Sequence, residues 1–330
     1  MSRRAFCLLF MFIMLSFPLQ GCSLYKEAGP LKTNLAGSRI NIVTSIFPLA
    51  DILQNIGGEL VEVTTLLSAG ASPHTYEPTV EQARIVARAD LIVYVGGGLD
   101  DWILKLASMA EKEVILVEVM DFLEGFVLPH LPPCTTAHDE EHHEHEHEHE
   151  EDCCDHFHGF YDPHVWTDPF LVKEKIAPSL AEILAGIKPE SKSEIMSNLK
   201  IFQEELQALH EEITAAVRSF TRKHFIAYHS AWNYFALRYG LEVVANVEEF
   251  PGKEPSAKWL SELVKLAGEH SVKVIFAEPQ LSSKVAQVIA AEIEGKVLIL
   301  DPLGGVGLTG RDSYIRLMRY NTEIFKQGLQ

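Results

Sequence analysis

Positive charge is scarce in this sequence. Its 330 residues hold 28 Lys and Arg against 46 Asp and Glu, which gives a net charge of −18. Ten of the acidic residues, and none of the basic ones, fall within residues 138–158. An acidic surface argues against nucleic acid and anionic membrane as partners, and it suits a cation.

Cysteine is also scarce, with five in the chain. Two lie near the N-terminus and three lie in or beside the acidic stretch, so neither half of the remaining chain has a disulfide of its own. Those three are Cys134, Cys153 and Cys154. Two interpretations remain open: Cys134 forms a disulfide with one of the other two, or the thiolates bind a metal.

Long apolar runs are confined to the N-terminus. Two arginines precede an apolar stretch at residues 5–17, which is too short to span a bilayer comfortably. The following Leu19-Gln20-Gly21-Cys22 resembles the bacterial lipoprotein cleavage box. We therefore expect residues 1–22 to be a lipoprotein-type signal peptide, with Cys22 lipidated, and residues 23–38 to be a tether. A plain secretory signal or an uncleaved anchor is the alternative, and each reading puts the protein outside the cytoplasm.

Strand and helix patterns alternate along the rest of the chain, which predicts an α/β fold with parallel sheets. Each half offers four strands with helices between them, so we expect two lobes, each a four-stranded, mostly parallel sheet with flanking helices. The predicted strands are residues 39–46, 60–67, 90–95, 113–119, 224–229, 241–247, 273–277 and 296–300.

One long helix is predicted between the two halves. Apolar residues recur there at steps of three and four over about 30 residues, a length of ~45 Å at 1.5 Å per residue. They are Ile195, Leu199, Phe202, Leu206, Leu209, Ile213, Val217 and Phe220. We therefore expect an N-terminal lobe at 39–188, a linking helix at 189–220 and a C-terminal lobe at 221–330.

Four metal-ligand side chains follow predicted strands. His74 comes after the second strand, His164 after the fourth strand and the acidic loop, His229 ends the fifth strand, and Asp301 follows the eighth. Ligands of open parallel sheets bind beyond the carboxyl ends of the strands. Three imidazoles and one carboxylate suit tetrahedral zinc. Taken singly, each His reads more readily as a structural residue, and Asp301 as a helix cap.

Carboxylates beside ligating histidines usually orient the rings. Glu77, Asp162, Asp168 and Glu278 lie near the same strand ends, and Asp162 and Glu278 are the favoured partners. The remaining histidines have no such placement and read as structural or surface residues. They are His130, His210, His224 and His270.

The acidic loop, residues 134–158, is rich in histidine as well as carboxylate. We expect it to be an accessory zinc collector or sensor, with a passive solubilising loop as the alternative. Its candidate ligands are His138, His142, His143, His145, His147, His149, His156 and His158.

Six motifs over residues 38–330 resemble the metal-binding solute-binding proteins of bacterial ABC importers, most closely the zinc-uptake branch. The motifs are GASPHTYEP, GGGLDDW, DPHVWTDP, HSAWNYFALRYGL, AEPQ and LDPLG. The resemblance implies two α/β lobes around a cleft, joined by a rigid helix. It implies His74, His164 and His229 as ligands, and a fourth from Asp301, water or a nearby Glu.

The resemblance also implies a function, which is to capture Zn²⁺ as cargo and deliver it to a permease with its ATPase. We expect a monomer that is not an enzyme and that meets the membrane only through its lipid anchor. A manganese-binding importer component is one alternative, although that branch tends to have Glu where His229 stands. A lipoprotein adhesin is another. A zinc hydrolase using Glu77 or Glu278 as base is less favoured, since no GxSxG motif occurs and the HExxH spacing is found only as HEHEH within the low-complexity acidic loop, at residues 143–147 and 145–149.

Overall fold

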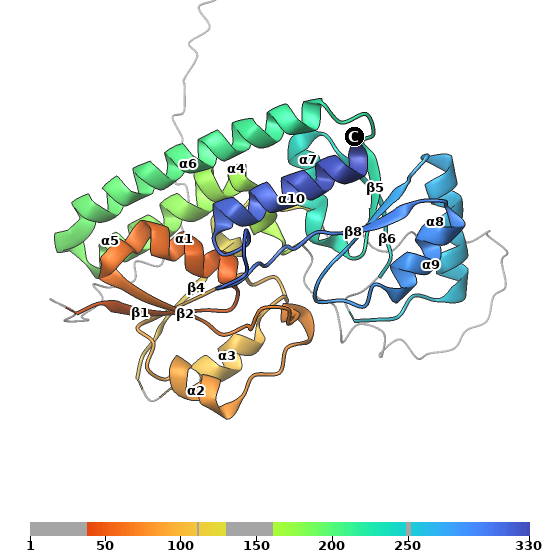
Figure 1. Cartoon of the computed structure of the whole chain (residues 1–330). Coiled ribbons are helices and arrows are strands. Elements are labelled where there is room, and N and C mark those ends of the chain that lie inside the picture. Colours follow the sequence, from red (N-terminus) through yellow and green to blue (C-terminus); the bar gives the residue numbers. More distant parts are fainter. Residues whose placement is uncertain (1–37, 111, 130–160, 249–251) are drawn as a thin grey trace, which may run out of the picture. The chain divides into compact units, whose positions relative to one another are not determined.

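Two four-stranded parallel sheets organise the chain (Figure 1). The computed structural model describes residues 38–110, 112–129, 161–248 and 252–330. The strand orders are β2-β1-β3-β4 and β6-β5-β7-β8, and every neighbouring pair is parallel. The strands are β1 Ile40–Thr44, β2 Val61–Thr65, β3 Leu91–Tyr94, β4 Ile115–Glu118, β5 His224–Ala227, β6 Glu242–Asn246, β7 Val274–Ala277 and β8 Lys296–Ile299. The predicted α/β class with two parallel sheets is confirmed, and all eight predicted strands are present.

Helices cover both faces of each sheet, as the crossovers between parallel strands require. The helices are α1 Phe47–Gly57, α2 Val80–Val86, α3 Trp102–Ala107, α4 Pro169–Leu171, α5 Ala177–Ile187, α6 Lys192–Arg218, α7 Asn233–Tyr239, α8 Ala257–Glu269, α9 Lys284–Glu292 and α10 Tyr314–Leu329. One face of the first sheet packs on α2 and α3, and one face of the second packs on α8 and α9. The opposite faces share a single large core with α1, α5, α6 and α10.

The predicted long helix is present as α6, preceded by a 3₁₀ turn at Pro189–Ser191. Seven of the eight predicted stripe residues lie on α6 and are buried against the shared core, and the eighth, Phe220, is buried just beyond the end of the helix. The helix packs against α1, α5 and α10 (Figure 1). Burial of this one face, more than helix propensity, therefore fixes α6 in place.

The last helix contacts elements of both halves. The backbone N–H of Tyr314 donates to Asp51 of α1 at 2.8 Å, and the Tyr314 hydroxyl donates to the Trp166 carbonyl at 2.7 Å. Near its other end, Phe325 packs against the rings of Phe225 and Phe276 in the second sheet. Helix α10 therefore ties the second sheet to the helical layer of the first.

Helices α4 and α5 are continuous through a wide turn. Residues Val172–Ile176 form a π-helical turn between α4 and α5. Pro178 lies two residues after this turn and has no backbone N–H to donate to the preceding turn of the helix. A widened turn accommodates that missing hydrogen bond without ending the helix.

Several expectations fall outside the described residues. They are the signal peptide and Cys22, the tether, Cys134, Cys153 and Cys154, His130, and the accessory ligands of the acidic loop. Within the described ranges, no helix combines the length and the apolar character needed to cross a bilayer.

Candidate metal centre

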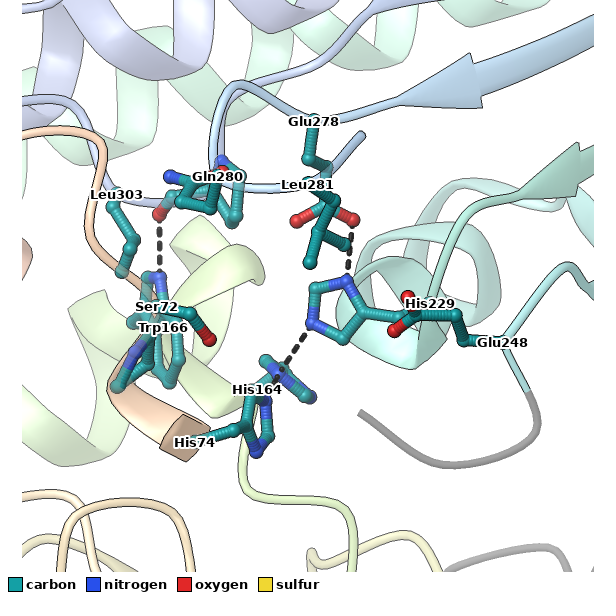
Figure 2. A pocket seen from close by; sticks show the side chains of 12 residues that line it. Ser72, His74, His164, Trp166, His229, Glu248, Glu278, Gln280, Leu281 and Leu303 are labelled. Carbon is teal, nitrogen blue, oxygen red and sulfur yellow. Dashed lines mark hydrogen bonds and ion pairs between the residues drawn. The ribbon is translucent and has the colours of Figure 1, made fainter. Parts of the chain in front are cut away.

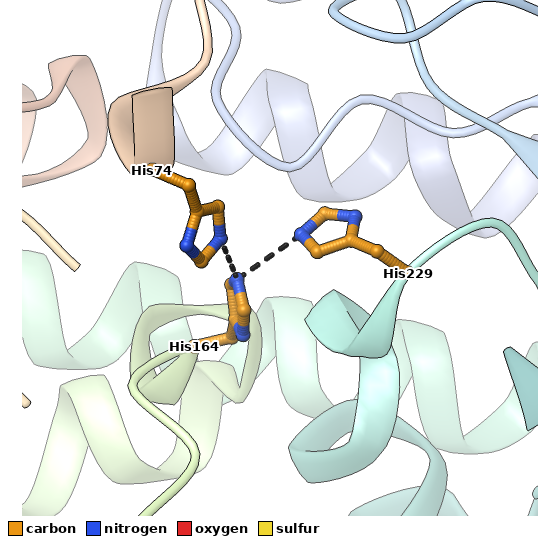
Figure 3. Close-up of side chains that lie close together, drawn as sticks. All are labelled: His74, His164 and His229. Carbon is orange, nitrogen blue, oxygen red and sulfur yellow. Dashed lines mark hydrogen bonds between the residues drawn. The ribbon is translucent and has the colours of Figure 1, made fainter. Parts of the chain in front are cut away.

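Three histidines from different parts of the chain meet at one point (Figure 3). His74 lies in a 3₁₀ turn after β2, His164 directly precedes a 3₁₀ turn at Val165–Thr167, and His229 follows β5. The Nε2 atom of His164 lies 3.3 Å from Nε2 of His74 and 3.2 Å from Nε2 of His229. The structure thus brings together the three histidines that the strand-end rule selected.

The spacing of the three nitrogens suits a small metal ion. Zinc binds imidazole nitrogen at ~2.0–2.1 Å, so two ligands at the corners of a tetrahedron lie about 3.4 Å apart. The Nε2 atom of His164 lies 3.3 and 3.2 Å from those of its two neighbours. An ion can therefore enter between the rings with little movement of the side chains.

Buried carboxylates fix the orientation of two of the rings. Nδ1 of His164 lies 2.7 Å from Oδ1 of Asp162, and Nδ1 of His229 lies 2.5 Å from Oε1 of Glu278. An ionised carboxylate only accepts hydrogen bonds, so each Nδ1 must carry the hydrogen. The Nε2 atom of each neutral ring is then a bare lone pair, which is the form that binds a metal.

With this tautomer, the Nε2 lone pairs of His164 and His229 have no hydrogen-bond donor between them. The Nε2 atoms of His164 and His229 lie 3.2 Å apart, and when both rings are neutral these two acceptors cannot bond to one another. Both side chains are buried, with 2% and 6% of their surface exposed, so bulk water does not relieve the contact. A proton or a metal ion between the rings satisfies both lone pairs.

Burial and charge act differently on the two rings. Burial is the main cause that lowers the pKa of His164 below its ordinary value, which favours a neutral ring. Burial also acts to lower the pKa of His229, but the charge and hydrogen bond of Glu278 outweigh it and raise that pKa overall. Zinc therefore competes with a proton chiefly at His229.

The carboxylate of Asp162 accepts hydrogen bonds from two residues, His164 and Asn233. Its Oδ1 also accepts the His164 backbone N–H, and its Oδ2 accepts the side-chain amide of Asn233 at 2.9 Å. Burial alone raises the pKa of Asp162, yet the charge of His164 and these hydrogen bonds lower it overall. Asp162 is therefore an ionised acceptor that anchors the His164 ring.

The histidines border a very small pocket (Figure 2). Its volume is about 20 Å³, which is room for one or two water molecules. Apolar residues including Trp166, Leu281 and Leu303 form much of its lining. Trp166 is fixed by a hydrogen bond from its Nε1 to the Pro302 carbonyl at 2.7 Å. The space beside the histidines thus has room for an ion.

Asp301 does not belong to this cluster, in contrast to the expectation of a fourth ligand. Its Oδ1 accepts the backbone N–H groups of Leu303 and Gly304, and its Oδ2 pairs with Arg311 at 2.8 Å. These partners use the carboxylate to hold the turn after β8. Asp168 likewise pairs elsewhere, with Arg238 at 2.8 Å.

Two residues that line the pocket were not among the site residues predicted from the sequence. Glu248 and Gln280 line the pocket beside His229 and Glu278 (Figure 2). Glu248 follows the end of β6 and Gln280 follows the end of β7. The same strand-end rule that selected the histidines could have found both.

A family model described as the periplasmic zinc-uptake complex component A, ZnuA, matches residues 42–328. The chain belongs to this family. The resemblance predicted from the motifs is therefore confirmed, and the family is one of solute-binding transport proteins.

Individual members of the ZnuA family are moderately similar to the chain. The zinc-binding protein AdcA of Streptococcus pyogenes serotype M3 is 31% identical over 308 residues, which cover 89% of this chain and 57% of AdcA. The chain therefore spans less than two thirds of that relative. The high-affinity zinc uptake system protein ZnuA of Bacillus subtilis strain 168 is 32% identical over 300 residues, with 89% and 88% covered. A crystal structure of ZnuA superposes with a TM-score of 0.72 at 28% identity, covering 89% of this chain and all of that one.

Proposed function

We propose that this protein captures one Zn²⁺ between His74, His164 and His229 and delivers it to an ABC permease with its ATPase. The observation that carries the proposal is the convergence of the three Nε2 atoms, with separations of 3.3 and 3.2 Å from His164, beside a buried, ion-sized pocket. The names of the relatives AdcA and ZnuA, which refer to zinc binding and zinc uptake, support the choice of metal and the role in transport.

The ligand set favours zinc over manganese. Imidazole nitrogen suits zinc, whereas manganese prefers carboxylate, carbonyl and water oxygen. Three imidazoles converge, and Asp301 is engaged by Arg311 and two backbone amides. Water or Glu248, which lines the pocket, completes the coordination.

Transport fits the site better than catalysis does. A catalytic zinc needs an open position with room for a substrate beside it. The pocket holds about 20 Å³, and the carboxylate of Glu278 is committed to the His229 ring. We therefore infer that the protein is not an enzyme.

The remaining parts of the chain have supporting roles in this proposal. Residues 1–22 direct the protein out of the cytoplasm and Cys22 anchors it by lipid, while residues 134–158 collect zinc weakly near the tight site. The lobes at 39–188 and 221–330 are joined by the helix at 189–220, and the protein acts as a monomer.

Replacing His229 by Ala tests the proposal. The variant loses one ligand of three, so tight zinc binding measured against a competing chelator is lost. His210→Ala is the matched control, because His210 lies on α6 and contacts Tyr239, away from the pocket. Wild-type zinc affinity in His229→Ala would refute the assignment.

A further inference from the structure

A second group of metal-ligand side chains lies at the opposite end of strand β5. His224 begins the strand, Glu242 begins the neighbouring strand β6, and His270 directly follows helix α8. Each offers one ligand atom, and these atoms all lie within 4.8 Å of one another. We propose that His224, Glu242 and His270 form a second site for a divalent transition-metal ion such as Zn²⁺.

The backbone holds two of the three ligands in register. His224 and Glu242 are paired positions of the parallel strands β5 and β6, so their side chains leave the sheet on the same face. Nε2 of His224 lies 3.1 Å from Oε2 of Glu242. Sheet pairing, rather than a chance meeting of long side chains, therefore sets this contact.

The third ligand comes from the end of a helix. The ring of His270 lies edge-on to that of His224, with centroids 5.5 Å apart and an interplanar angle of 85°. The C-terminal end of a helix carries partial negative charge, which favours a nearby cation. Helix α8 ends at Glu269, so its negative end borders the cluster.

The geometry suits a metal with two nitrogen ligands and one oxygen ligand. Tetrahedral zinc places its ligands about 3.4 Å apart; the His224 and Glu242 ligand atoms are 3.1 Å apart, and all three ligand atoms lie within 4.8 Å of one another. The side chains of His224 and Glu242 are 42% and 56% exposed, so they can turn inward and an ion can enter from solvent. Open positions on the metal are left for water.

Neighbouring lysines do not occupy the cluster. Lys223 directs its ammonium group to the Val217 carbonyl, and Lys273 directs its own to the Ile293 carbonyl at 2.6 Å. In the absence of metal, the His224–Glu242 contact is a hydrogen bond from Nε2–H to the carboxylate. When a metal ion binds, the ring hydrogen moves to Nδ1, and the ion takes its place between Nε2 and the carboxylate.

The second site is separate from the histidine pocket. His224 begins β5 and His229 follows the end of that strand, five residues later, which is roughly 16 Å at 3.3 Å per extended residue. The two sites share no ligand, so zinc binding at one can be measured independently of the other.

Residue-level chemical modification tests the proposal in the full chain, where other zinc-binding residues would obscure a simple stoichiometry. Histidines are carbethoxylated by diethylpyrocarbonate across a zinc titration, and each modified residue is quantified by mass spectrometry. We expect His224 and His270 to lose reactivity together, at one zinc concentration. Glu242→Gln should move that concentration upward by about tenfold or more, because a charged ligand is lost.

Glu269→Gln is the matched control, since it removes the same charge one residue before His270 and should leave the midpoint unchanged. His210 reports general effects of zinc on reactivity. Three outcomes would overturn the proposal: unprotected His224 and His270, protection at unrelated zinc concentrations, or a Glu242→Gln midpoint equal to the wild type. Chelator competition on the same samples reports the tight site separately.

Discussion

The role of Glu278 leads to a quantitative prediction about zinc affinity. Its carboxylate accepts the Nδ1 hydrogen of His229 at 2.5 Å and is 98% shielded from solvent, with 2% of its surface exposed. Glu278→Gln keeps the size of the side chain but removes the charge. The amide can also turn its NH₂ toward Nδ1, which moves the ring hydrogen to Nε2 and blocks the metal-binding atom.

The expected loss follows from both effects. Removing a carboxylate that orients a ligating histidine typically weakens metal binding by ~10–100-fold, or about 1.4–2.7 kcal/mol. Zinc affinity is measured at neutral pH by competition with a chromophoric chelator, with thermal unfolding as a check that the variant folds.

Glu212→Gln serves as the matched control for this substitution. Glu212 pairs with Arg319 on the surface of α6, so its loss changes the net charge equally without touching the pocket. A Glu278→Gln affinity within about twofold of the wild type and of this control would refute the argument that the carboxylate sets the tautomer.

Four further predictions concern stability and the division of roles. Asp301→Asn should lower stability by about 1.5–3 kcal/mol through its lost charged hydrogen bonds, yet leave zinc affinity unchanged in the same chelator assay. Leu206→Ala, at a fully buried position of α6, should cost about 2–5 kcal/mol in denaturant unfolding, whereas Ile201→Ala, 56% exposed on the same helix, should cost less than about 0.5. Burial raises the pKa of Asp100 from 3.8 to about 6, so the folded state binds this proton more tightly than the unfolded state. Stability should therefore fall as pH rises from about 4 to 6, by up to ~3 kcal/mol from this group, and Asp100→Asn should remove that slope in unfolding measured across this range. Deleting residues 138–158 should lower the total zinc bound, measured by equilibrium dialysis, while one tight site persists; loss of the tight site would contradict the proposed roles.

Much of this fold can be predicted from local patterns in the sequence. The spacing of apolar residues on α6 marks the face that is buried, and a glycine in the αL conformation, Gly240, ends α7. These features depend on neighbouring residues along one helix, so they can be recognised without knowing the tertiary structure.

The histidine pocket was predictable for a different reason. Parallel strands present their carboxyl ends at one edge of a sheet, so residues such as His229 that follow those ends are brought together by topology alone. The partner of Asp301 was not predictable in this way. Arg311 lies ten residues later in an irregular segment, and only the folded turn shows that the two side chains meet.

The cluster of His224, Glu242 and His270 shows the same limit. Both strands were predicted, but their contact depends on β5 and β6 being neighbours and on His224 standing opposite Glu242. A shift of one residue in that register would turn one side chain to the other face of the sheet. Strand order and register are properties of the whole sheet, so the histidines read as unrelated surface residues in the sequence.

The central claim is that zinc is bound by the three Nε2 atoms of His74, His164 and His229. Diffraction at the zinc absorption edge from crystals of the zinc-loaded protein tests it most directly. We predict a strong anomalous peak in the pocket, ~2.0–2.1 Å from each of the three Nε2 atoms. A pocket without such a peak, or a zinc ion that one of these nitrogens does not touch, would contradict the account.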